Sequence, residues 1–276
     1  SGDLKRAKKQ IEALNLLLTQ DLEKGNNEIS SAIWSALKGK DYVEEIIVPT
    51  EQKSWQQALG DEPLVNLDNR LTLNKQQALA FSQLLFQEGF NVWLLEGVTG
   101  SGKTEIYLQY IEEVLKKGKQ VLVLVPEIGL TPQTVRRFQA RFNVEIDVLH
   151  SNLNDTQRLN VWERARTGQS AIVIGTRSAL FTQFSDLGLI ILDEEHDGSF
   201  KQQDGWRYHA RDLGIVLAQK LNFPILLGSA TPSLESVNNV INGKFPLSAL
   251  SKIVRNATVL RQFVFDLKHQ RIQNSL

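Results

Sequence analysis

The sequence has 276 residues, of which 42% are hydrophobic and 22% charged; this is typical of a globular chain with a substantial core and predicts one to two domains. Its 31 basic and 31 acidic residues argue against a large electrostatic footprint for nucleic acid, although a local basic stripe stays compatible with them. The absence of cysteine excludes disulfides and thiolate metal sites and favours a cytoplasmic setting, and no apolar run approaches the ~18 residues of a membrane-spanning helix.

The first fifty residues predict a small module. Apolar residues at helical spacing predict a helix over residues 3–23. Ser30 or Ser31 can cap a second, short helix, and the β-branched stretch 42–48 predicts a strand. Two helices and a strand within residues 1–50 resemble part of a winged-helix module, and a plain helical appendage fits the pattern equally well.

The remaining chain predicts a linker, an α/β domain and a connector. Glycine, proline and polar residues in 51–70 predict the linker. Over residues 71–245 strands alternate with helices, which predicts a parallel sheet flanked by helices. The predicted strands are 92–95, 120–125, 144–149, 171–174, 189–192 and 224–227, and the predicted helices are 75–87, 103–116, 132–140, 155–166, 210–221 and 233–240. Residues 246–276 predict a connector with a strand-like stretch at 262–267.

A glycine-rich motif, Gly97-Val-Thr-Gly-Ser-Gly-Lys-Thr104, lies between an apolar strand pattern and a helix pattern. This context predicts a phosphate-binding loop, whose backbone N–H groups turn towards the phosphates at the positive end of a helix. Lys103 would reach the β- and γ-phosphates of ATP, and the Thr104 hydroxyl would bind Mg²⁺. The residues expected to bind the nucleotide here are Gly97, Thr99, Gly100, Ser101, Gly102, Lys103 and Thr104. The alternative is a glycine-rich turn that matches by chance.

A second motif, Asp193-Glu-Glu-His196, follows an aliphatic strand. It predicts carboxylates at the edge of the sheet where open α/β sheets bind ligands. Asp193 can hold Mg²⁺, and Glu194 can orient or deprotonate the water that attacks the γ-phosphate. A solvated acidic turn is the alternative, but the phosphate-binding loop upstream favours the catalytic interpretation.

A third motif, Gly228-Ser-Ala-Thr-Pro232, follows the next aliphatic strand. The hydroxyls of Ser229 and Thr231 could bond to the acidic cluster and report the state of the nucleotide elsewhere. Taken alone, the segment would be an ordinary start of a helix that contains proline.

Together these motifs resemble the DExH-type helicases and translocases of the second helicase superfamily, and more closely the bacterial helicases that restart stalled replication forks. The resemblance is dense over residues 71–245 and implies a RecA-like P-loop motor lobe. The stretches that carry it are Gly97–Glu105, Val125–Pro132, Gly175–Phe181, Asp193–His196, Lys201–Asp212 and Gly228–Pro232.

The resemblance also implies roles for residues outside the nucleotide motifs. Gln77 is similar to the glutamine that reads adenine, although it could be an ordinary exposed helix residue. Residues 201–211 resemble an aromatic-rich loop that couples DNA to ATP hydrolysis by stacking on bases, although its Trp206 could instead pack into the domain. The residues implied in DNA coupling are Gly129, Thr131, Thr176, Arg177, Trp206, Arg207, Ser229 and Thr231.

By this resemblance the chain is expected to be a fragment of an ATP-dependent 3′-to-5′ DNA helicase that uses Mg²⁺. Forked and single-stranded DNA, primosome proteins and single-strand-binding protein are the expected partners, for a monomer in the bacterial cytoplasm. Such helicases carry a cysteine-rich zinc module and a second motor lobe, neither of which is visible in this sequence. Two alternatives stay open: another P-loop enzyme, such as a kinase or a restriction-type translocase, and a module that binds DNA or partners through residues 1–50 without turnover.

Overall fold

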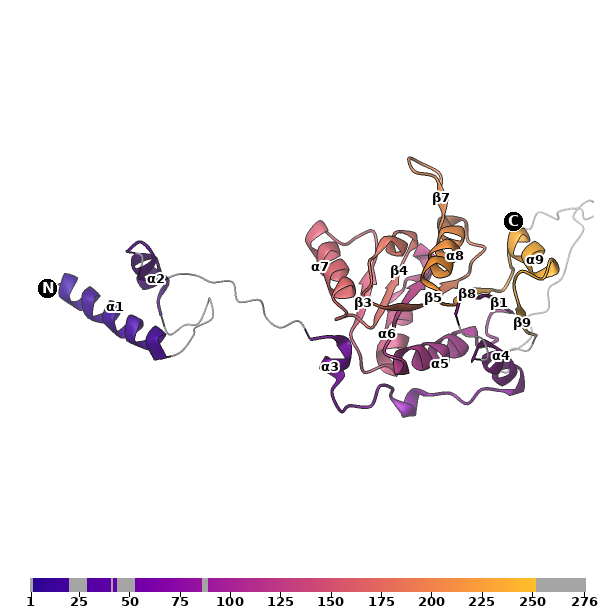
Figure 1. The fold of residues 1–276 in the computed structure, drawn as a ribbon, viewed down its shortest axis with the longest axis horizontal. Helices are drawn as coiled ribbons and strands as arrows, with labels where there is room; N and C mark the ends of the chain where they lie inside the picture. The colour runs from indigo at the N-terminus through magenta and orange to yellow at the C-terminus, as the bar shows by residue number, and fades with distance from the viewer. Residues whose placement is uncertain (1, 20–28, 41, 44–52, 86–88, 252–276) are drawn as a thin grey trace, which may run out of the picture. The chain divides into compact units, whose positions relative to one another are not determined.

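The computed structural model divides into two compact units, residues 1–51 and 52–276, which we describe separately (Figure 1). It describes residues 2–19, 29–40, 42–43, 53–85 and 89–251.

The first unit contains two helices, α1 (Gly2–Thr19) and α2 (Ser31–Lys38). Ala13, Ile29 and Leu37 form its small apolar core. Both predicted helices are present. Of the predicted strand over residues 42–48, only the first two residues are described, and they are not in a strand; the remainder lies outside the described residues. The winged-helix interpretation therefore stays a prediction.

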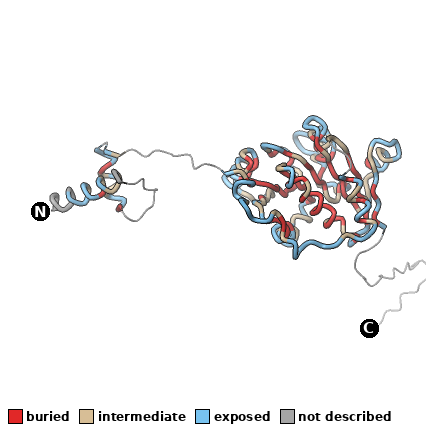
Figure 2. Tube along the Cα trace, turned by 60° about the horizontal axis from the view of Figure 1, so that its bottom comes forward, coloured by how far each residue is buried: buried red, intermediate tan, exposed pale blue. Residues whose placement is uncertain are grey.

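The second unit is built on a sheet of seven strands in the order β3-β4-β2-β5-β8-β1-β9, in which every neighbouring pair is parallel. The strands are β1 (Val92–Gly97), β2 (Gln120–Leu124), β3 (Ile146–Leu149), β4 (Ile172–Gly175), β5 (Leu187–Asp193), β8 (Ile225–Ser229) and β9 (Leu247–Leu250). The central strands are buried on both faces, which explains their continuous aliphatic sequences (Figure 2). All six predicted strands are confirmed.

Helices cover both faces of this sheet. The helices are α4 (Lys75–Leu85), α5 (Lys103–Lys116), α6 (Pro132–Arg141), α7 (Asp155–Arg166), α8 (Ala210–Leu221) and α9 (Leu234–Ile241). Helices α4, α5 and α6 cover one face, and α7 and α8 cover the other (Figure 1). Because side chains alternate along a strand, Val123 packs into the first of these apolar cores and Leu122 into the second. The side chains of Thr131, Asn154 and Ser233 cap the starts of α6, α7 and α9, and all three are residue types that favour this position.

Two segments differ from the sequence prediction. In the predicted linker 51–70, the described residues form the short helices α3 (Trp55–Leu59) and η1 (Leu67–Asn69) and belong to the second unit. Trp55 is buried, because a large aromatic side chain gains most free energy by joining the core. Its backbone N–H donates to the carbonyl of Gly168 at 2.8 Å.

The second difference lies in the predicted connector 246–276. Its residues 247–250 form strand β9, which pairs with β1. β9 is an edge strand whose residues alternate between exposed and buried, so it lacks the aliphatic run that marks the other strands. The strand-like stretch 262–267 lies outside the described residues.

Candidate active site

The loop between β1 and α5 lies at the carboxyl edge of the sheet. Gly100 and Gly102 have φ of 83° and 84°, in the left-handed region that favours glycine. A Cβ on Gly97 would lie 2.5 Å from Ser101 Oγ, so the loop closes tightly only around glycine. Ser101 Oγ is buried and has no hydrogen-bond partner among the described residues. A buried hydroxyl without a partner beside a glycine turn at a helix start fits a phosphate oxygen.

Lys103 is held back against this loop. Its side chain is buried, and its Nζ donates to the carbonyl of Gly97 at 2.7 Å. Its Nζ also lies 3.7 Å from Glu194 Oε1. The structure thus brings together the predicted cation of the phosphate loop and the predicted catalytic carboxylate.

Asp193 ends β5 in an environment that disfavours its charge. Burial raises the pKa of this carboxyl, and a hydrogen bond from the Tyr107 hydroxyl, 2.9 Å from Asp193 Oδ1, partly opposes that rise. The pKa of Tyr107 is raised by burial and by Asp193, so the phenol stays neutral and donates. A cation at this position would stabilise the carboxylate. Asp193 is therefore a suitable ligand for Mg²⁺.

Glu194 adopts an unusual backbone conformation, with φ of 49°. Among the described residues only Asn222 shares a positive φ without being glycine. This conformation is disfavoured for a side chain with a Cβ and is found at functional sites. It points the Glu194 carboxylate towards Lys103 and towards Ala230, whose N–H lies 3.4 Å from Oε2.

Gln77 is buried, which excludes the interpretation as an exposed helix residue. Its Nε2 donates to the carbonyl of Ser101 at 2.9 Å, and its Oε1 accepts the N–H of Asn74 at 2.8 Å. The amide thus braces the phosphate loop. A second N–H and a second lone pair stay available on it, so its contact with adenine stays a prediction.

The residues predicted for Mg²⁺ converge without forming a closed metal site. Thr104 is half-buried at the start of α5 and Asp193 ends β5. Among the described residues, no group of three or more His, Cys, Asp or Glu side chains could hold a metal ion. Mg²⁺ commonly uses one or two protein ligands together with water and substrate phosphates, so this sparse set fits it.

The third motif contacts the acidic motif through His196, as well as through the Ala230 N–H that faces Glu194. His196 Nδ1 lies 2.8 Å from Ser229 Oγ, which also accepts the N–H of Thr231 at 2.9 Å. Packing favours glycine at position 228, since a Cβ there would overlap the Tyr107 hydroxyl. The predicted link between Ser229 and the acidic motif is therefore present, whereas the Thr231 side chain is exposed.

The loops predicted to contact DNA lie at the same edge, after β2 and β4. Thr131 Oγ1 accepts the N–H of Thr134 at 3.2 Å and caps α6, beside half-buried Gly129. Thr176 is buried, whereas Arg177 Nη1 donates to the carbonyls of Ser199 and Lys201, each at 3.0 Å. Arg177 thereby ties the loop after β4 to the aromatic segment.

The aromatic segment forms a hairpin of two short strands, β6 (Lys201–Gln202) and β7 (Tyr208–His209). Trp206 is 92% exposed near its tip, so the alternative that it packs into the domain is wrong. Arg207 is exposed beside it. Tyr208 instead packs inwards, with its ring edge-on to Phe181 at 5.2 Å between ring centroids. The hairpin presents a free indole and a cation.

Tyr107, which bonds to Asp193, has no role in the sequence interpretation. Glu195 enters that interpretation only as a member of the acidic motif, and Arg211 only as a charge of the aromatic-rich segment 201–211, whereas the structure buries both side chains. Tyr107 lies one helical turn after Lys103, so helical spacing alone could have placed it beside Asp193. The partners of Glu195 come from distant parts of the sequence, and no local pattern marks them.

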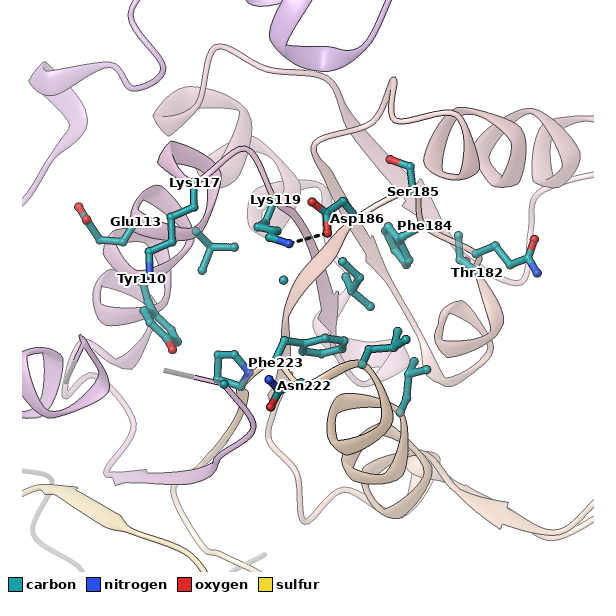
Figure 3. A pocket seen from close by; sticks show the side chains of 18 of the residues that line it. Tyr110, Glu113, Lys117, Lys119, Thr182, Phe184, Ser185, Asp186, Asn222 and Phe223 are labelled. Atoms are coloured by element: carbon teal, nitrogen blue, oxygen red, sulfur yellow. Dashed lines mark hydrogen bonds and ion pairs between the residues drawn. The ribbon is translucent and has the colours of Figure 1, made fainter. Parts of the chain in front are cut away.

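A large cavity lies away from these residues (Figure 3). Its volume is about 650 Å³, and Tyr110, Asp186 and Phe223 contribute to its wall. Asp186 and Phe223 precede β5 and β8, so the cavity lies at the amino edge of the sheet, opposite the phosphate loop. Burial raises the pKa of Tyr110 to about 12. Because the cavity lies at the opposite edge of the sheet from the phosphate loop, it is not the candidate nucleotide site.

Comparison with known proteins now defines the class. Residues 74–240 match the DEAD/DEAH box helicase family, and the chain therefore belongs to that family. The parallel sheet with helices on both faces agrees with the predicted RecA-like P-loop lobe. No described helix is long and apolar enough to cross a membrane.

Particular relatives are known as well. The chain is similar to "Replication restart protein PriA" of Haemophilus influenzae, with 76% identity over 275 residues, which cover 100% of this chain and 38% of the relative. The protein of the same name in Bacillus subtilis is 40% identical over 245 residues, covering 88% of this chain and 29% of that protein. The structure of RecG bound to a three-way DNA junction aligns with a TM-score of 0.49 and 24% identity, covering 66% of this chain and 24% of RecG. The chain thus spans well under half the length of these proteins.

Proposed function

We propose that this chain is the first motor lobe of an ATP-dependent DNA helicase that acts at stalled replication forks, in primosome assembly and replication restart. The observation that carries the proposal is the convergence of Lys103, Asp193 and Glu194 at one edge of the sheet, beside a glycine loop with a buried, unpaired hydroxyl. The high identity to a replication restart protein supports the biological setting.

In the proposed reaction Lys103 exchanges the carbonyl of Gly97 for phosphate oxygens. Thr104 and Asp193 would hold Mg²⁺, which would supply positive charge against the phosphates. Glu194 then orients a water molecule and accepts its proton, as a positioned carboxylate can. Glu194, with its backbone φ of 49°, has its carboxylate 3.7 Å from the Nζ of Lys103 in the phosphate loop.

The DNA strand is proposed to run over the loops after β2 and β4 and past the hairpin. Gly129, Thr131, Thr176 and Arg177 would line the path of the phosphates, and Trp206 would stack on a base. Movement from 3′ to 5′ follows only from the resemblance. The same holds for primosome proteins and single-strand-binding protein as partners, for the monomeric state, and for the bacterial cytoplasm. A zinc module of the longer protein belongs to this proposal too.

The test is steady-state ATP hydrolysis by a full-length protein that carries this chain, with and without forked DNA. We expect forked DNA to stimulate turnover and Lys103→Ala to abolish it, because the cation that faces the phosphates is lost. For the chain alone we expect weak nucleotide binding and little turnover, because an arginine finger, expected from a second lobe, is worth ~10³–10⁵ in rate. Turnover that forked DNA leaves unchanged would contradict the helicase proposal. Unchanged fork affinity without any turnover would favour a binding module.

A further inference from the structure

The carboxylate of Glu195, two residues after the end of β5, is fully buried. Its exposed fraction is 0%. Glu195 Oε1 accepts the N–H of Ser233 at 2.7 Å, and Oε2 accepts the hydroxyls of Ser233 and Ser236, each at 3.0 Å. Arg211 Nη1 completes the set, 3.2 Å from Oε2. Four donors thus satisfy one buried charge.

The donors come from two elements that lead to different parts of the site. Arg211 lies in the first turn of α8, two residues after the hairpin strand β7. Ser233 and Ser236 begin α9, directly after the third motif. Glu195 itself follows the catalytic candidate Glu194 in the chain. One side chain therefore joins the hairpin that bears Trp206, the third motif and the loop that bears Glu194.

Arg211 is buried, with 6% of its surface exposed, and it has several polar partners. Its Nε donates to Asp212 Oδ1 at 2.9 Å, and its Nη1 donates to Ser233 Oγ at 2.6 Å. Exposed Glu235 lies 3.9 Å from Nη1. The backbone N–H of Arg211 donates to His209 Nδ1 at 3.2 Å, which ties it to the end of the hairpin. The backbone of Arg211 is thereby bonded to the last residue of the hairpin.

A buried ion pair of this kind is a poor device for stability. Apolar side chains of similar volume often stabilise a fold equally well, because burying two charges costs much of their attraction. What the pair contributes is a fixed relative orientation of the two side chains, since a bond between a guanidinium and a carboxylate forms only in a narrow range of geometries. The neighbouring Glu194 needs such a constraint, because its backbone has a φ of 49°.

We propose that Glu195 and Arg211 form a positioning pair, which transmits occupancy of the hairpin 201–209 to the catalytic carboxylate of Glu194. The inference rests on the proposed function, and it assigns roles to two residues outside the nucleotide-binding and DNA-contacting sets. When a DNA strand engages the hairpin, Arg211 shifts at the start of α8. The Glu195 carboxylate follows it, and the adjoining backbone sets the direction of Glu194.

The test compares turnover with and without forked DNA in a full-length protein that carries this chain. For Glu195→Gln we expect the stimulation by DNA to fall by about 5- to 150-fold, the range of ordinary coupling between sites. The DNA-free rate and the KM for ATP should change less than about twofold, as long as Lys103, Asp193 and Glu194 stay in place. Arg211→Gln should give the same loss, and the double variant should be no worse than either single one, because both remove one link. Arg211→Lys should recover part of the stimulation.

Matched controls separate coupling from general damage. Lys220→Gln removes an exposed charge from the same helix α8, and Glu235→Gln removes an exposed carboxylate 3.9 Å from Arg211. Both should keep full stimulation. Equal losses with and without DNA would show that the pair is only structural and would overturn the proposal, as would additive losses in the double variant. Should Glu195→Gln lose its cooperative melting transition, the comparison of Arg211→Lys with Arg211→Gln decides. A parent protein that DNA does not stimulate would refute the proposed function, whereas a stimulated parent with an unaffected Glu195→Gln variant refutes only this pair.

Discussion

The carboxyl edge of the sheet has two halves that differ in how far their side chains are buried and bonded within the protein. In the nucleotide half, Ser101 and Gln77 are buried and Lys103 already bonds within the protein. In the half predicted to face DNA, Trp206 is 92% exposed and Ile128 85% exposed. The difference teaches where preorganisation is useful: fixed groups around a small charged ligand avoid reorganisation during reaction, whereas exposed side chains on loops adapt to a strand of variable sequence.

Removal of the Glu194 carboxylate, proposed to be catalytic, should have the largest effect on the nucleotide half. Glu194→Gln in a full-length protein should lower kcat by about 10²–10⁴-fold, the usual contribution of a positioned acid or base. ATP binding should persist, because Lys103 and Thr104 are unchanged. Phosphate release and binding of a fluorescent ATP analogue measure the two effects, with exposed Glu163→Gln as the control. Hydrolysis at the parental rate would remove Glu194 from this role.

Substitution of Trp206 at the hairpin tip tests the half predicted to face DNA and leaves the candidate nucleotide-binding residues unchanged. Trp206→Ala should weaken single-strand binding by about 1–3 kcal/mol, the value of one stacked base. The melting temperature and the DNA-free ATPase should not change, because the indole is exposed. Trp206→Phe keeps a ring and should recover part of the affinity. Equal loss of DNA-free and DNA-stimulated turnover would instead indicate a structural role.

A pair of glycines compares how tightly the two halves are packed. Gly228→Ala places a Cβ into the Tyr107 hydroxyl and should destabilise the chain by about 1–3 kcal/mol. Gly198→Ala, in the loop before the hairpin, has open space around the new Cβ and should leave the melting temperature unchanged. Adding Tyr107→Phe to Gly228→Ala should restore part of the stability. Similar melting temperatures for both alanine variants would mean that the nucleotide half is not the tighter one.

The smallest effect concerns Thr131, for which sequence and structure suggest different roles. Thr131→Ala should cost about 1 kcal/mol of stability, because the hydroxyl caps α6. Thr131→Ser keeps the cap and should melt like the parent. If the hydroxyl also contacts a DNA phosphate, the serine variant should keep DNA affinity and the alanine variant should lose it; thermal melting and strand binding measured together separate these roles. An alanine variant that melts like the parent would show that the cap contributes little.

The sequence predicts the parts of this unit that local patterns determine. Aliphatic strands buried on both faces are visible as runs, and motifs that follow such strands must meet at one edge of a parallel sheet. This is why the convergence of Lys103 with Asp193 and Glu194 could be predicted from the sequence alone. The roles assigned to these residues stay predictions.

Local patterns do not reveal contacts between distant segments. Trp55 joins the core through Gly168, and Glu195 meets Arg211 and Ser233, so neither result follows from nearby residues. β9 was missed because an edge strand of four residues shows only weak alternation. The polar bracing of Gln77 on Ser101 likewise depends on how the chain closes.

The left-handed backbone of Glu194 has a consequence for engineering heat resistance. An L-residue with a Cβ loses roughly 1–2 kcal/mol in that conformation, and glycine does not. Glu194→Gly should therefore raise the melting temperature slightly although it removes the carboxylate proposed to be catalytic, whereas Glu194→Gln retains the Cβ and gains nothing. Screens for thermostable variants would favour replacement of this glutamate, so selection for stability alone would remove the residue that the proposed hydrolysis requires.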